Sequence, residues 1–584
     1  MLMEKDNLLQ VNKPARYIGN EWNSSHKEFD KAGIKFALCF PDLYEIGMSN
    51  LGVRILYGLL NNIDGVCCER FFSPDLDMED LLRKEGRPIS SLESGKGMSD
   101  FNFIGFSLPH ELNYTNVLTL LDLGGIPLKA SDRDSNHPFV IGGGPCVLNP
   151  EPLHAFFDFF VIGEGEEAIH EILQLYRSFK DDLYKGRITR LQILAKFASI
   201  EGVYVPLLYD VDYDKDGALI KFIPKFENIP QVVKKRIVKD LDNMYFPAQW
   251  LLPYIQIVHD RITLEIMRGC PNSCRFCQGR SQYYPFRQRS VNAILSLAVK
   301  SYSCTGYEEI SLAGLSVSDY KDIEKLLDEL TKIFYDRKVN LSLPSIKPKN
   351  YVGRISETIS KIKKTGLTFA PEAASERLRK LIGKDFDMTV FNEALRQSYA
   401  AGYQHVKLYF LIGLPQETDQ DLDQIVRFAE DVSSMRKPFG KGPAHVNISV
   451  NTLIPKPHTP FQWLKMLDLE SIKQKQVYLK KMMKNGRIKM DFHDSYMSVI
   501  EGIFSRGDRR LSEVLLAAFK KGARFDAWRN RFNYSIWELS FKECCLDPLI
   551  YLGERPKEAR LPWSFLDIGI SESYLLSEFN KLLQ

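Results

Sequence analysis

The 584-residue chain has no run of the roughly 18 apolar residues that a membrane-spanning helix needs. Its first residues, MLMEKDNLLQVNKPARY, contain no apolar core of the kind that a secretion signal carries. The chain also has little net charge, because 77 Lys and Arg residues nearly balance 74 Asp and Glu residues to give +3. That balance predicts neither a polyanion-binding protein nor a membrane-surface protein. We therefore expect a cytoplasmic protein with no membrane partner.

Cysteine is scarce, with 10 residues in the whole chain, yet three of them fall in the short stretch MRGCPNSCRFCQGR. They are Cys270, Cys274 and Cys277, spaced C-x3-C-x2-C. In the cytoplasm disulfides are rare, and clustered cysteines more often bind metal or carry out redox chemistry. Zinc sites usually close with four ligands, but no cysteine or histidine lies between Cys277 and Cys304.

Three thiolates suit a cubic iron–sulfur cluster, since they leave one iron without a protein ligand and free to bind a small molecule. Two alternatives remain at this point. The thiols could lie together on a core loop without function, or a distant residue could complete a zinc site. The flanking Gly269, Pro271 and Asn272 are residues of an exposed turn and disfavour the core loop.

The length predicts about three domains. Short apolar strands at 34–38, 101–108, 138–144 and 158–165 alternate with helical stretches near 50–62, 111–124 and 166–178. This alternation is typical of a parallel sheet with helices on both faces, so residues 31–178 are expected to form a doubly wound, Rossmann-like α/β domain. Residues 1–30 would be an N-terminal arm, and 179–255 a connector with a hairpin around Asp216-Gly217.

A second βα series begins near residue 256, and its expected strands are 261–269, 308–314, 339–345, 366–372, 405–413 and 445–454. Six successive units predict a (βα)6 partial barrel over 256–480, with catalytic residues after the strands. The cysteine cluster follows the first of these strands. Residues 481–584 are expected to be mostly helical.

The spacing C-x3-C-x2-C, with the aromatic Phe276 just before the third cysteine, resembles the radical S-adenosylmethionine (radical SAM) superfamily. The resemblance implies a [4Fe-4S] cluster on Cys270, Cys274 and Cys277. It also implies that the amino and carboxylate groups of S-adenosylmethionine chelate the open iron. One electron, from a flavodoxin- or ferredoxin-like donor, would then cleave the cofactor to a 5'-deoxyadenosyl radical. The catalytic acid or base is not indicated.

The expected strand ends offer side chains and turns for S-adenosylmethionine. Glu372, Ser375 and Arg379 would meet its amino, ribose and carboxylate groups, and arginine suits a carboxylate because it donates two parallel hydrogen bonds. The alternative for Ser375 and Arg379 is a capped helix start with solvated charges. The last expected strand ends in a loop with His458, which would line the substrate side or be structural. The full set of expected cofactor contacts in this half is Phe276, Gly314, Ser316, Glu372, Ser375, Arg379 and Gly413.

Further stretches along nearly the whole chain are similar to a radical SAM subgroup with an N-terminal cobalamin-binding-like domain. They include FPDLYEIGMSNLG, FSLPHELNYTN, IGGGPCVLNPEP, IGEGEEA, RGDRRL and GARFDAW. Glycines after two neighbouring strands would let the nucleotide tail of cobalamin approach the backbone. No D-x-H-x-x-G occurs in 31–178, so no lower histidine ligand is expected, and Lys347 stands where the subgroup has arginine. The expected cobalamin contacts are Gly142, Gly143, Gly144, Gly163 and Gly165.

Three functions follow as hypotheses. The first is cobalamin-assisted methylation or a related modification by a radical SAM enzyme, with the corrin ring facing the barrel mouth. The second is cobalamin-independent modification of RNA or a ribosomal component, with the N-terminal domain used for docking or packing. Methylthio transfer, a special case of it, normally uses a second cluster, for which Cys39, Cys67, Cys68 and Cys146 form no clean ligand set. The third hypothesis is an electron-transfer or scaffold protein. Such a protein would need no S-adenosylmethionine pocket, so the strand-end residues suited to that cofactor argue against it.

Overall fold

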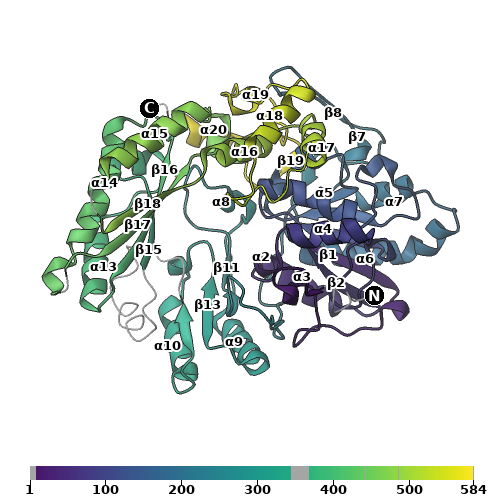
Figure 1. Cartoon of the computed structure of the whole chain (residues 1–584), viewed down its shortest axis with the longest axis horizontal. Coiled ribbons are helices and arrows are strands. Elements are labelled where there is room, and N and C mark those ends of the chain that lie inside the picture. Colours follow the sequence, from purple (N-terminus) through teal and green to yellow (C-terminus); the bar gives the residue numbers. More distant parts are fainter. Residues whose placement is uncertain (1–7, 343–366, 441, 484–485, 583–584) are drawn as a thin grey trace. The chain divides into compact units, whose positions relative to one another are not determined.

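The computed structural model describes residues 8–342, 367–440, 442–483 and 486–582. Two compact units make up the chain (Figure 1). Unit 1 contains Met1–Asp260, Ile503–Tyr551 and Glu558–Gly569, and unit 2 contains Arg261–Gly502, Leu552–Lys557 and Ile570–Gln584. The sequence had suggested five successive segments. In the structure, most of the C-terminal helical region instead packs with the N-terminal sheet in unit 1.

Unit 1 is built on a six-stranded sheet in the order β2-β1-β3-β4-β5-β6. The first five strands are parallel, and the short β6 is antiparallel to β5. This confirms the predicted N-terminal Rossmann-like α/β domain. The strands are β1 (Ile34–Phe40), β2 (Val66–Phe72), β3 (Phe103–Ser107), β4 (Phe139–Gly143), β5 (Phe159–Val161) and β6 (Val203–Tyr204). The helices are α2 (Tyr44–Gly47), α3 (Leu51–Asn61), α4 (Leu76–Glu85), α5 (Tyr114–Leu123), α6 (Gly165–Tyr184) and α7 (Arg190–Phe197).

The strands of this sheet are buried almost without interruption, as parallel strands covered on both faces must be. Aromatic rings pack between the sheet and the helices α6 and α7. The ring of Phe103 lies edge-on to Tyr176 at 4.8 Å, and Phe139 lies edge-on to Phe197 at 5.5 Å. Edge-to-face packing of this kind stabilises the core beyond the area that it buries.

The remaining elements of unit 1 join segments that are far apart in the sequence. The hairpin expected around Asp216-Gly217 is formed by β7 (Tyr209–Tyr213) and β8 (Leu219–Pro224). Strand β9 (Val233–Lys234) pairs in parallel with β19 (Leu566–Asp567) near the end of the chain. Helix α17 (Leu511–Lys520) packs on α5 and on α18 (Tyr534–Glu543).

Unit 2 contains two parallel sheets in its described part, β10-β13-β14 and β15-β16-β17-β18. All six expected strands are present, although residues 343–345 and 366 of those predictions lie outside the described residues, as does Lys347. The (βα)6 barrel stays a prediction because 343–366, which joins the two sheets, is not described. The strands are β10 (Ile262–Glu265), β13 (Glu309–Ala313), β14 (Asn340–Ser342), β15 (Leu367–Glu372), β16 (His405–Ile412), β17 (His445–Thr452) and β18 (Ile488–Phe492).

Helices alternate with these strands along unit 2. They are α9 (Val291–Thr305), α10 (Ile323–Phe334), α12 (Glu376–Leu381), α13 (Met388–Ala400), α14 (Asp419–Ser434) and α15 (Leu469–Met482). Strand β18 pairs in parallel with β17, within a segment that the sequence had suggested to be mostly helical. The other helices of that segment are α16 (Ser495–Arg506), α19 (Leu549–Leu552) and α20 (Glu572–Asn580).

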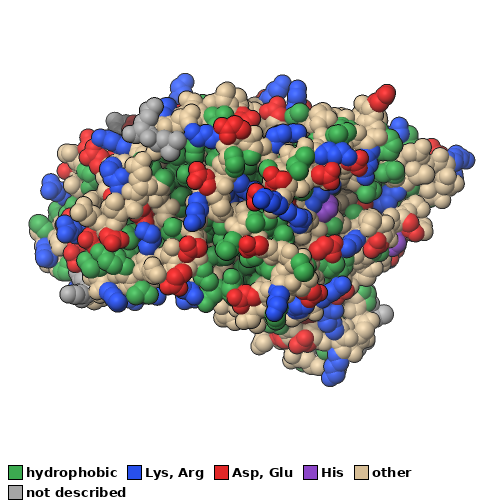
Figure 2. All heavy atoms as spheres, turned by 90° about the horizontal axis from the view of Figure 1, so that it is seen from above, with side chains coloured by type: hydrophobic (Ala, Val, Ile, Leu, Met, Phe, Trp, Pro, Cys, Tyr) green, Lys and Arg blue, Asp and Glu red, His purple; other side chains and the backbone are tan. Residues whose placement is uncertain are grey.

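No helix in the described ranges is both long and apolar enough to cross a membrane. Figure 2 shows blue and red side chains intermingled over the visible face, without a broad field of one sign. This mixture agrees with the small net charge of the chain and gives a polyanion no extended track on that face.

Candidate active site

The cysteine loop follows the first strand of unit 2. The two-residue strand β11 (Met267–Arg268) pairs with β12 (Arg287–Gln288) and so closes the loop at its base. Gly269 adopts φ +81, and a Cβ there would lie 2.8 Å from the carbonyl oxygen of Pro285. Only glycine fits this turn, because both the backbone angle and the close approach exclude a side chain. Cys270, Cys274 and Cys277 are each partly exposed residues.

Arg275 ties this loop to the end of helix α12. Its guanidinium donates to the carbonyl oxygen of Leu381 at 2.5 Å, and its carboxylate partner is Glu578 at 2.9 Å. Gly383, with φ +69, allows the carbonyl of Ser273 to approach, since a Cβ there would be 2.8 Å from that oxygen. The cysteine loop and the loop after β15 are therefore held in one fixed relation within unit 2.

The thiol of Cys277 sits at the start of the short helix α8 (Gln278–Gln282). Burial and the neighbouring charge of Cys270 raise its pKa, while Lys384 and the backbone N–H groups of Arg280 and Gly279 act in the opposite direction. The backbone donors aimed at the sulfur favour a thiolate once a metal replaces the proton. The thiol set and its surroundings thus fit an iron–sulfur centre.

A hydrogen-bonded chain leads from Cys270 to the turn after β13. The side-chain amide nitrogen of Asn272 lies 3.1 Å from the Cys270 sulfur and 2.8 Å from a carboxylate oxygen of Asp319. The hydroxyl of Ser316 donates to the same carboxylate oxygen at 2.7 Å. Ser316 was expected to contact S-adenosylmethionine. Its hydroxyl is engaged by Asp319 and the residue is only 3% exposed, and a cofactor contact at Ser316 stays a prediction.

Glu372 ends strand β15 with φ +65, and its carboxylate accepts a hydrogen bond from Lys384 Nζ at 2.9 Å. Lys384 Nζ also lies 5.8 Å from the centre of the Phe276 ring. The structure therefore brings the expected residues Glu372 and Phe276 to one place, beside the cysteine loop. The sequence alone did not single out Lys384, although the expected residues Glu372, Ser375 and Arg379 belong to the same stretch; Lys384 follows the short helix α12 and returns to Glu372 only in the fold.

Ser375 and Arg379 have the contacts of a capped helix. The Ser375 side chain accepts the N–H of Leu378 at the start of α12 and is 5% exposed. Arg379 is 2% exposed, donates to the carbonyl of Ala374 at 2.5 Å, and stacks 4.7 Å from the ring of Phe386. The helix cap at Ser375 matches the structural alternative, whereas Arg379 is buried and is not the solvated charge that this alternative expected. A cofactor role for either side chain stays a prediction.

The two other expected turns are also packed by the chain itself. A Cβ on Gly314 would lie 2.5 Å from the side chain of Met267. The Gly413 N–H donates to both carboxylate oxygens of Glu417 at 3.1 Å. The loop after β17 lies against α8, since the carbonyl of His458 accepts the Ser281 hydroxyl at 2.6 Å. Cofactor contacts at Gly314 and Gly413 therefore stay predictions.

The glycines after β4 differ from one another. A Cβ on Gly142 would lie 2.6 Å from the Phe160 ring, and one on Gly144, with φ +105, would lie 3.0 Å from the carbonyl of Leu108. Gly143 has nothing within 4 Å of its Cβ position, and it pairs with the half-exposed Ser107 of β3. Of these three glycines, only Gly143 opens onto free space at the carboxyl edge of the sheet.

The turn after β5 is occupied by another segment of unit 1. Gly163 adopts φ +103, and a Cβ there would lie 2.3 Å from the carbonyl oxygen of Arg236. The two residues form a parallel bridge, with the Arg236 N–H donating to Ile162. Gly165 has only ordinary contacts, with the side chains of Ile169 and Leu56. The close approach that Gly163 allows is thus made by the chain's own backbone.

The space between the ends of β1 and β3, where the strand order reverses, is also filled. Asp42 accepts hydrogen bonds from the Trp528 indole at 2.9 Å and from Asn113 at 3.0 Å. Burial raises the pKa of Asp42. The side chain of Asn116 accepts the N–H of Phe525 at 2.9 Å. In open α/β sheets this switch point is the usual ligand crevice, and here residues 525–528 line it within unit 1.

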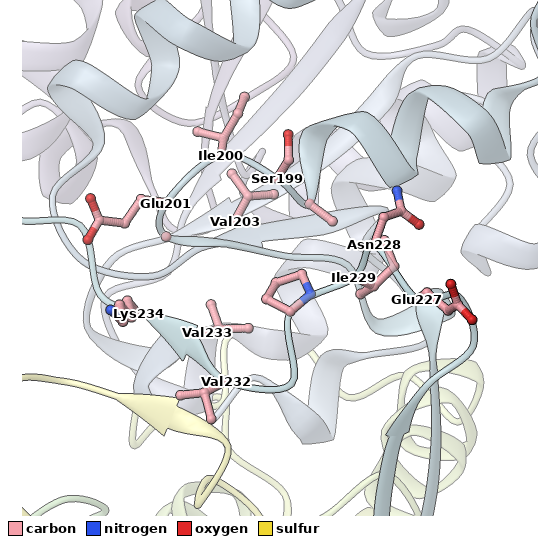
Figure 3. Close-up of a pocket in the computed structure, with 13 residues that line it drawn as sticks. Ser199, Ile200, Glu201, Val203, Glu227, Asn228, Ile229, Val232, Val233 and Lys234 are labelled. Carbon is pink, nitrogen blue, oxygen red and sulfur yellow. The ribbon is translucent and has the colours of Figure 1, made fainter.

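A separate cavity of about 590 Å³ lies in unit 1 between the end of α7 and the segment that leads into β9 (Figure 3). Glu201, Glu227 and Lys234 lie at its rim, and Val203, Ile229 and Val233 line its apolar part. None of the residues expected to bind a cofactor lines it. The cavity has no feature that points to a particular ligand.

The fold is that of an α/β protein, and its three-cysteine loop is the candidate metal centre. Sequence comparison identifies the superfamily. Residues 264–429 match the family described as the radical SAM superfamily, and residues 52–206 match the family described as radical SAM proteins, N-terminal. The chain therefore contains a radical SAM region, preceded by a region of this second family, and is a radical SAM enzyme.

Three relatives illustrate the range of similarity. An uncharacterized protein of Methanocaldococcus jannaschii is 28% identical over 86% of this chain and 97% of its own length. An uncharacterized methyltransferase of Pyrococcus horikoshii is 25% identical over 52% of this chain and 60% of its own length. The ribosomal protein uS12 methylthiotransferase RimO of Thermodesulfovibrio yellowstonii is 25% identical over 29% of this chain and 41% of its own length.

Among solved structures, the chain is similar to the radical S-adenosylmethionine methyltransferase TsrM of Kitasatospora setae, solved with cobalamin and a [4Fe-4S] cluster. The match covers 87% of this chain and 99% of TsrM, with 12% identity and a TM-score of 0.48. Likeness of this degree carries no argument about the ligands of this chain.

Proposed function

We propose that the chain holds a [4Fe-4S] cluster on Cys270, Cys274 and Cys277 and reductively cleaves S-adenosylmethionine. One observation supports this proposal most strongly. Arg275 hydrogen-bonds the cysteine loop to the end of α12, and the pair Glu372 and Lys384 lies beside that loop. When bound, the cluster supplies one electron to the sulfonium of S-adenosylmethionine. The residues of the chain then have to hold and orient the cofactor.

Glu372 and Lys384 are suited to the amino-acid end of S-adenosylmethionine. The carboxylate of Glu372 can pair with the ammonium group of the cofactor, and the ammonium of Lys384 can pair with its carboxylate. The two side chains lie 2.9 Å apart. Phe276 adds an apolar surface close to Lys384. Both side chains are half-buried, so their interactions are screened less than those of exposed charges.

We further propose that the radical serves cobalamin-assisted methylation or a related modification. Two observations support this. Gly143 and Ser107 form an open, half-exposed patch at the carboxyl edge of a parallel sheet, and such edges bind ligands. One relative of this chain is described as a methyltransferase. The patch is narrower than the sequence suggested, because the chain itself occupies the turn at Gly163.

The alternative is cobalamin-independent modification of RNA or a ribosomal component. The filled space beside Asp42 and the occupied turn at Gly163 favour it, as does the similarity to a ribosomal protein methylthiotransferase. In that case unit 1 would serve for packing or docking.

Anaerobic purification from cobalamin-fed cells separates the two functions. We expect corrin absorbance in the unaltered protein and its loss in Gly143→Leu, because the added side chain fills the open patch. Gly97→Leu is the matched control, since the nearest atom to a Cβ on Gly97 is 3.7 Å away and the residue lies outside the patch. Absence of corrin from the unaltered protein, even after titration, would exclude the methylation proposal and leave the alternative.

A further inference from the structure

Asn272 lies between Cys270 and Cys274, the first two cysteines of the spacing, and its side chain contacts the sulfur of Cys270. Its amide nitrogen lies 3.1 Å from the sulfur of Cys270 and 2.8 Å from Asp319 Oδ2. A cysteine loop needs no side chain at this position to bind metal. The amide therefore affects the charge environment of the Cys270 sulfur and not the set of metal ligands.

The orientation of the Asn272 amide follows from its neighbours. Both neighbours, a sulfur that becomes a thiolate on metal binding and a carboxylate, accept hydrogen bonds and do not donate them. The NH2 group carries two hydrogens and can serve both acceptors at once, whereas the amide oxygen would be repelled by both. Asp319 is held in turn by the hydroxyl of Ser316 at 2.7 Å. The amide donor is therefore fixed on the sulfur by a chain of two further residues.

We propose that Asn272, positioned by Asp319, raises the reduction potential of the iron–sulfur centre by donating a hydrogen bond to Cys270. The inference rests on the proposed cluster of this same site and adds a tuning residue to it. Asn272 is a positioning and tuning residue, not a metal ligand.

The physical reason is the charge of the reduced centre. One-electron reduction adds a negative charge that spreads over the sulfurs, and a hydrogen bond to a charged acceptor strengthens as its charge grows. Hydrogen bonds to cluster sulfurs, net charge and solvent exposure set the potential of such centres. The donor therefore stabilises the reduced form more than the oxidised form. Electrons would reach the centre from an external one-electron donor.

The test is an anaerobic redox titration of the reconstituted full chain, followed by electron paramagnetic resonance of the reduced cluster. We expect Asn272→Ala to shift the reduction equilibrium toward the oxidised cluster by roughly fivefold, which at 59 mV per tenfold is about 40 mV. Asn272→Asp, which keeps the shape of the side chain but donates no hydrogen bond when ionised, should shift it at least as far. Iron and sulfide content should stay at the level of the unaltered protein.

The matched control is Ser273→Ala, an exposed neighbour in the same loop, which should leave the equilibrium unchanged. Equal potentials for Asn272→Ala, Asn272→Asp and Ser273→Ala, each with a full cluster, would overturn the inference. If Asn272→Ala holds no cluster, Asn272→Asp decides alone. If the unaltered protein itself holds no cluster, the proposed function fails, and that result differs from a held cluster whose potential does not move.

Discussion

Lys384 places a positive charge at the edge of the cysteine loop, between the carboxylate of Glu372 and the ring of Phe276. The ion pair is half-buried, so its attraction is worth more than the fraction of a kcal/mol typical of exposed pairs. Arg379, by contrast, is a buried residue of α12 and stacks on Phe386. The two cations lie near one another in the sequence but have different environments and should respond differently to substitution.

Lys384→Gln should weaken binding of S-adenosylmethionine, because it removes a charge-assisted contact of roughly 1.5–3 kcal/mol, or about ten- to a hundredfold in Kd. Arg379→Gln should instead lower the melting temperature and change affinity little. Equilibrium binding and thermal melting of both anaerobically reconstituted variants measure the two effects. A tenfold loss of affinity in Arg379→Gln at an unchanged melting temperature would show that Arg379 binds the cofactor.

Asp526 makes the stability of unit 1 depend on pH. Burial raises the pKa of its carboxyl to about 6, against the opposing hydrogen bonds from Thr115 and Trp537. The folded form therefore holds its proton more tightly than the unfolded form. Its contribution to stability is present at pH 4 and is lost as the pH rises through about 6.

Asp526→Asn should remove this dependence, because an amide does not ionise and can accept the Trp537 hydrogen bond. Relative to the unaltered protein, the variant should gain about 2–3 kcal/mol between pH 4 and pH 7.5, at 1.36 kcal/mol per pKa unit. Thermal melting of both proteins across that range measures the difference. Parallel stability curves for the two proteins would show that Asp526 ionises freely in the fold.

At the scale of residues, the three cysteines could be selected as candidate ligands because their spacing is local, and Glu372 could be selected as the last residue of a strand; their cofactor roles stay predictions. Lys384 could not, since its side chain reaches Glu372 from beyond a helix. The sequence also cannot distinguish Gly143 from Gly163. Both follow strands, and only the fold shows that Arg236 fills the space at Gly163 while Gly143 stays open.

At the scale of elements, most strands of the parallel sheets in both units could be predicted from apolar runs, and the miss at β2 has a physical cause. Strand β2 carries Glu69 and Arg70 in its middle, which hides the apolar pattern. Both are buried, and Arg70 is paired with Glu21 and Glu93 at 2.6 Å, which offsets the cost of burying the charge. Strand β18 alternates buried and exposed residues as β16 and β17 do. That pattern is typical of a strand, so β18 could have been predicted from the sequence.

The two glycine turns of unit 1 give a matched pair of substitutions. Gly163→Ala should destabilise the protein by about 2–4 kcal/mol, because alanine strains the backbone at φ +103 and its Cβ would meet the Arg236 carbonyl. Gly143→Ala should leave the melting temperature nearly unchanged, since its Cβ meets open space. Thermal melting of the two variants decides, and equal melting temperatures would contradict the assigned close approach at Gly163.

At the scale of the whole molecule, unit 1 is completed by residues that follow unit 2 in the sequence. The Arg509 guanidinium donates hydrogen bonds to the Glu151 carboxylate and to the Tyr204 hydroxyl, each at 2.8 Å. Glu151 has no exposed side-chain surface and also accepts from Tyr204 and Tyr213. Pairings across more than 350 positions, such as Glu151 with Arg509, have no local pattern. For this reason the C-terminal region read as a separate helical segment.

Arg509→Met should destabilise unit 1 by about 3–5 kcal/mol, because it leaves the buried Glu151 carboxylate without its cation. The double variant Arg509→Met with Glu151→Gln should recover part of that loss, since the charge is then gone. Thermal melting of the single and double variants measures the coupling between the two residues. Additive losses in the double variant would show that the pair is not coupled.

The central claim is that the three-cysteine loop supports reductive cleavage of S-adenosylmethionine, and anaerobic detection of 5'-deoxyadenosine tests it most directly. The dithionite-reduced, reconstituted chain should form 5'-deoxyadenosine slowly even without substrate. The variant with alanine in place of Cys270, Cys274 and Cys277 should form none and should lose the cluster absorbance. A triple variant that keeps about four irons per chain and forms 5'-deoxyadenosine at the rate of the unaltered protein would contradict the account.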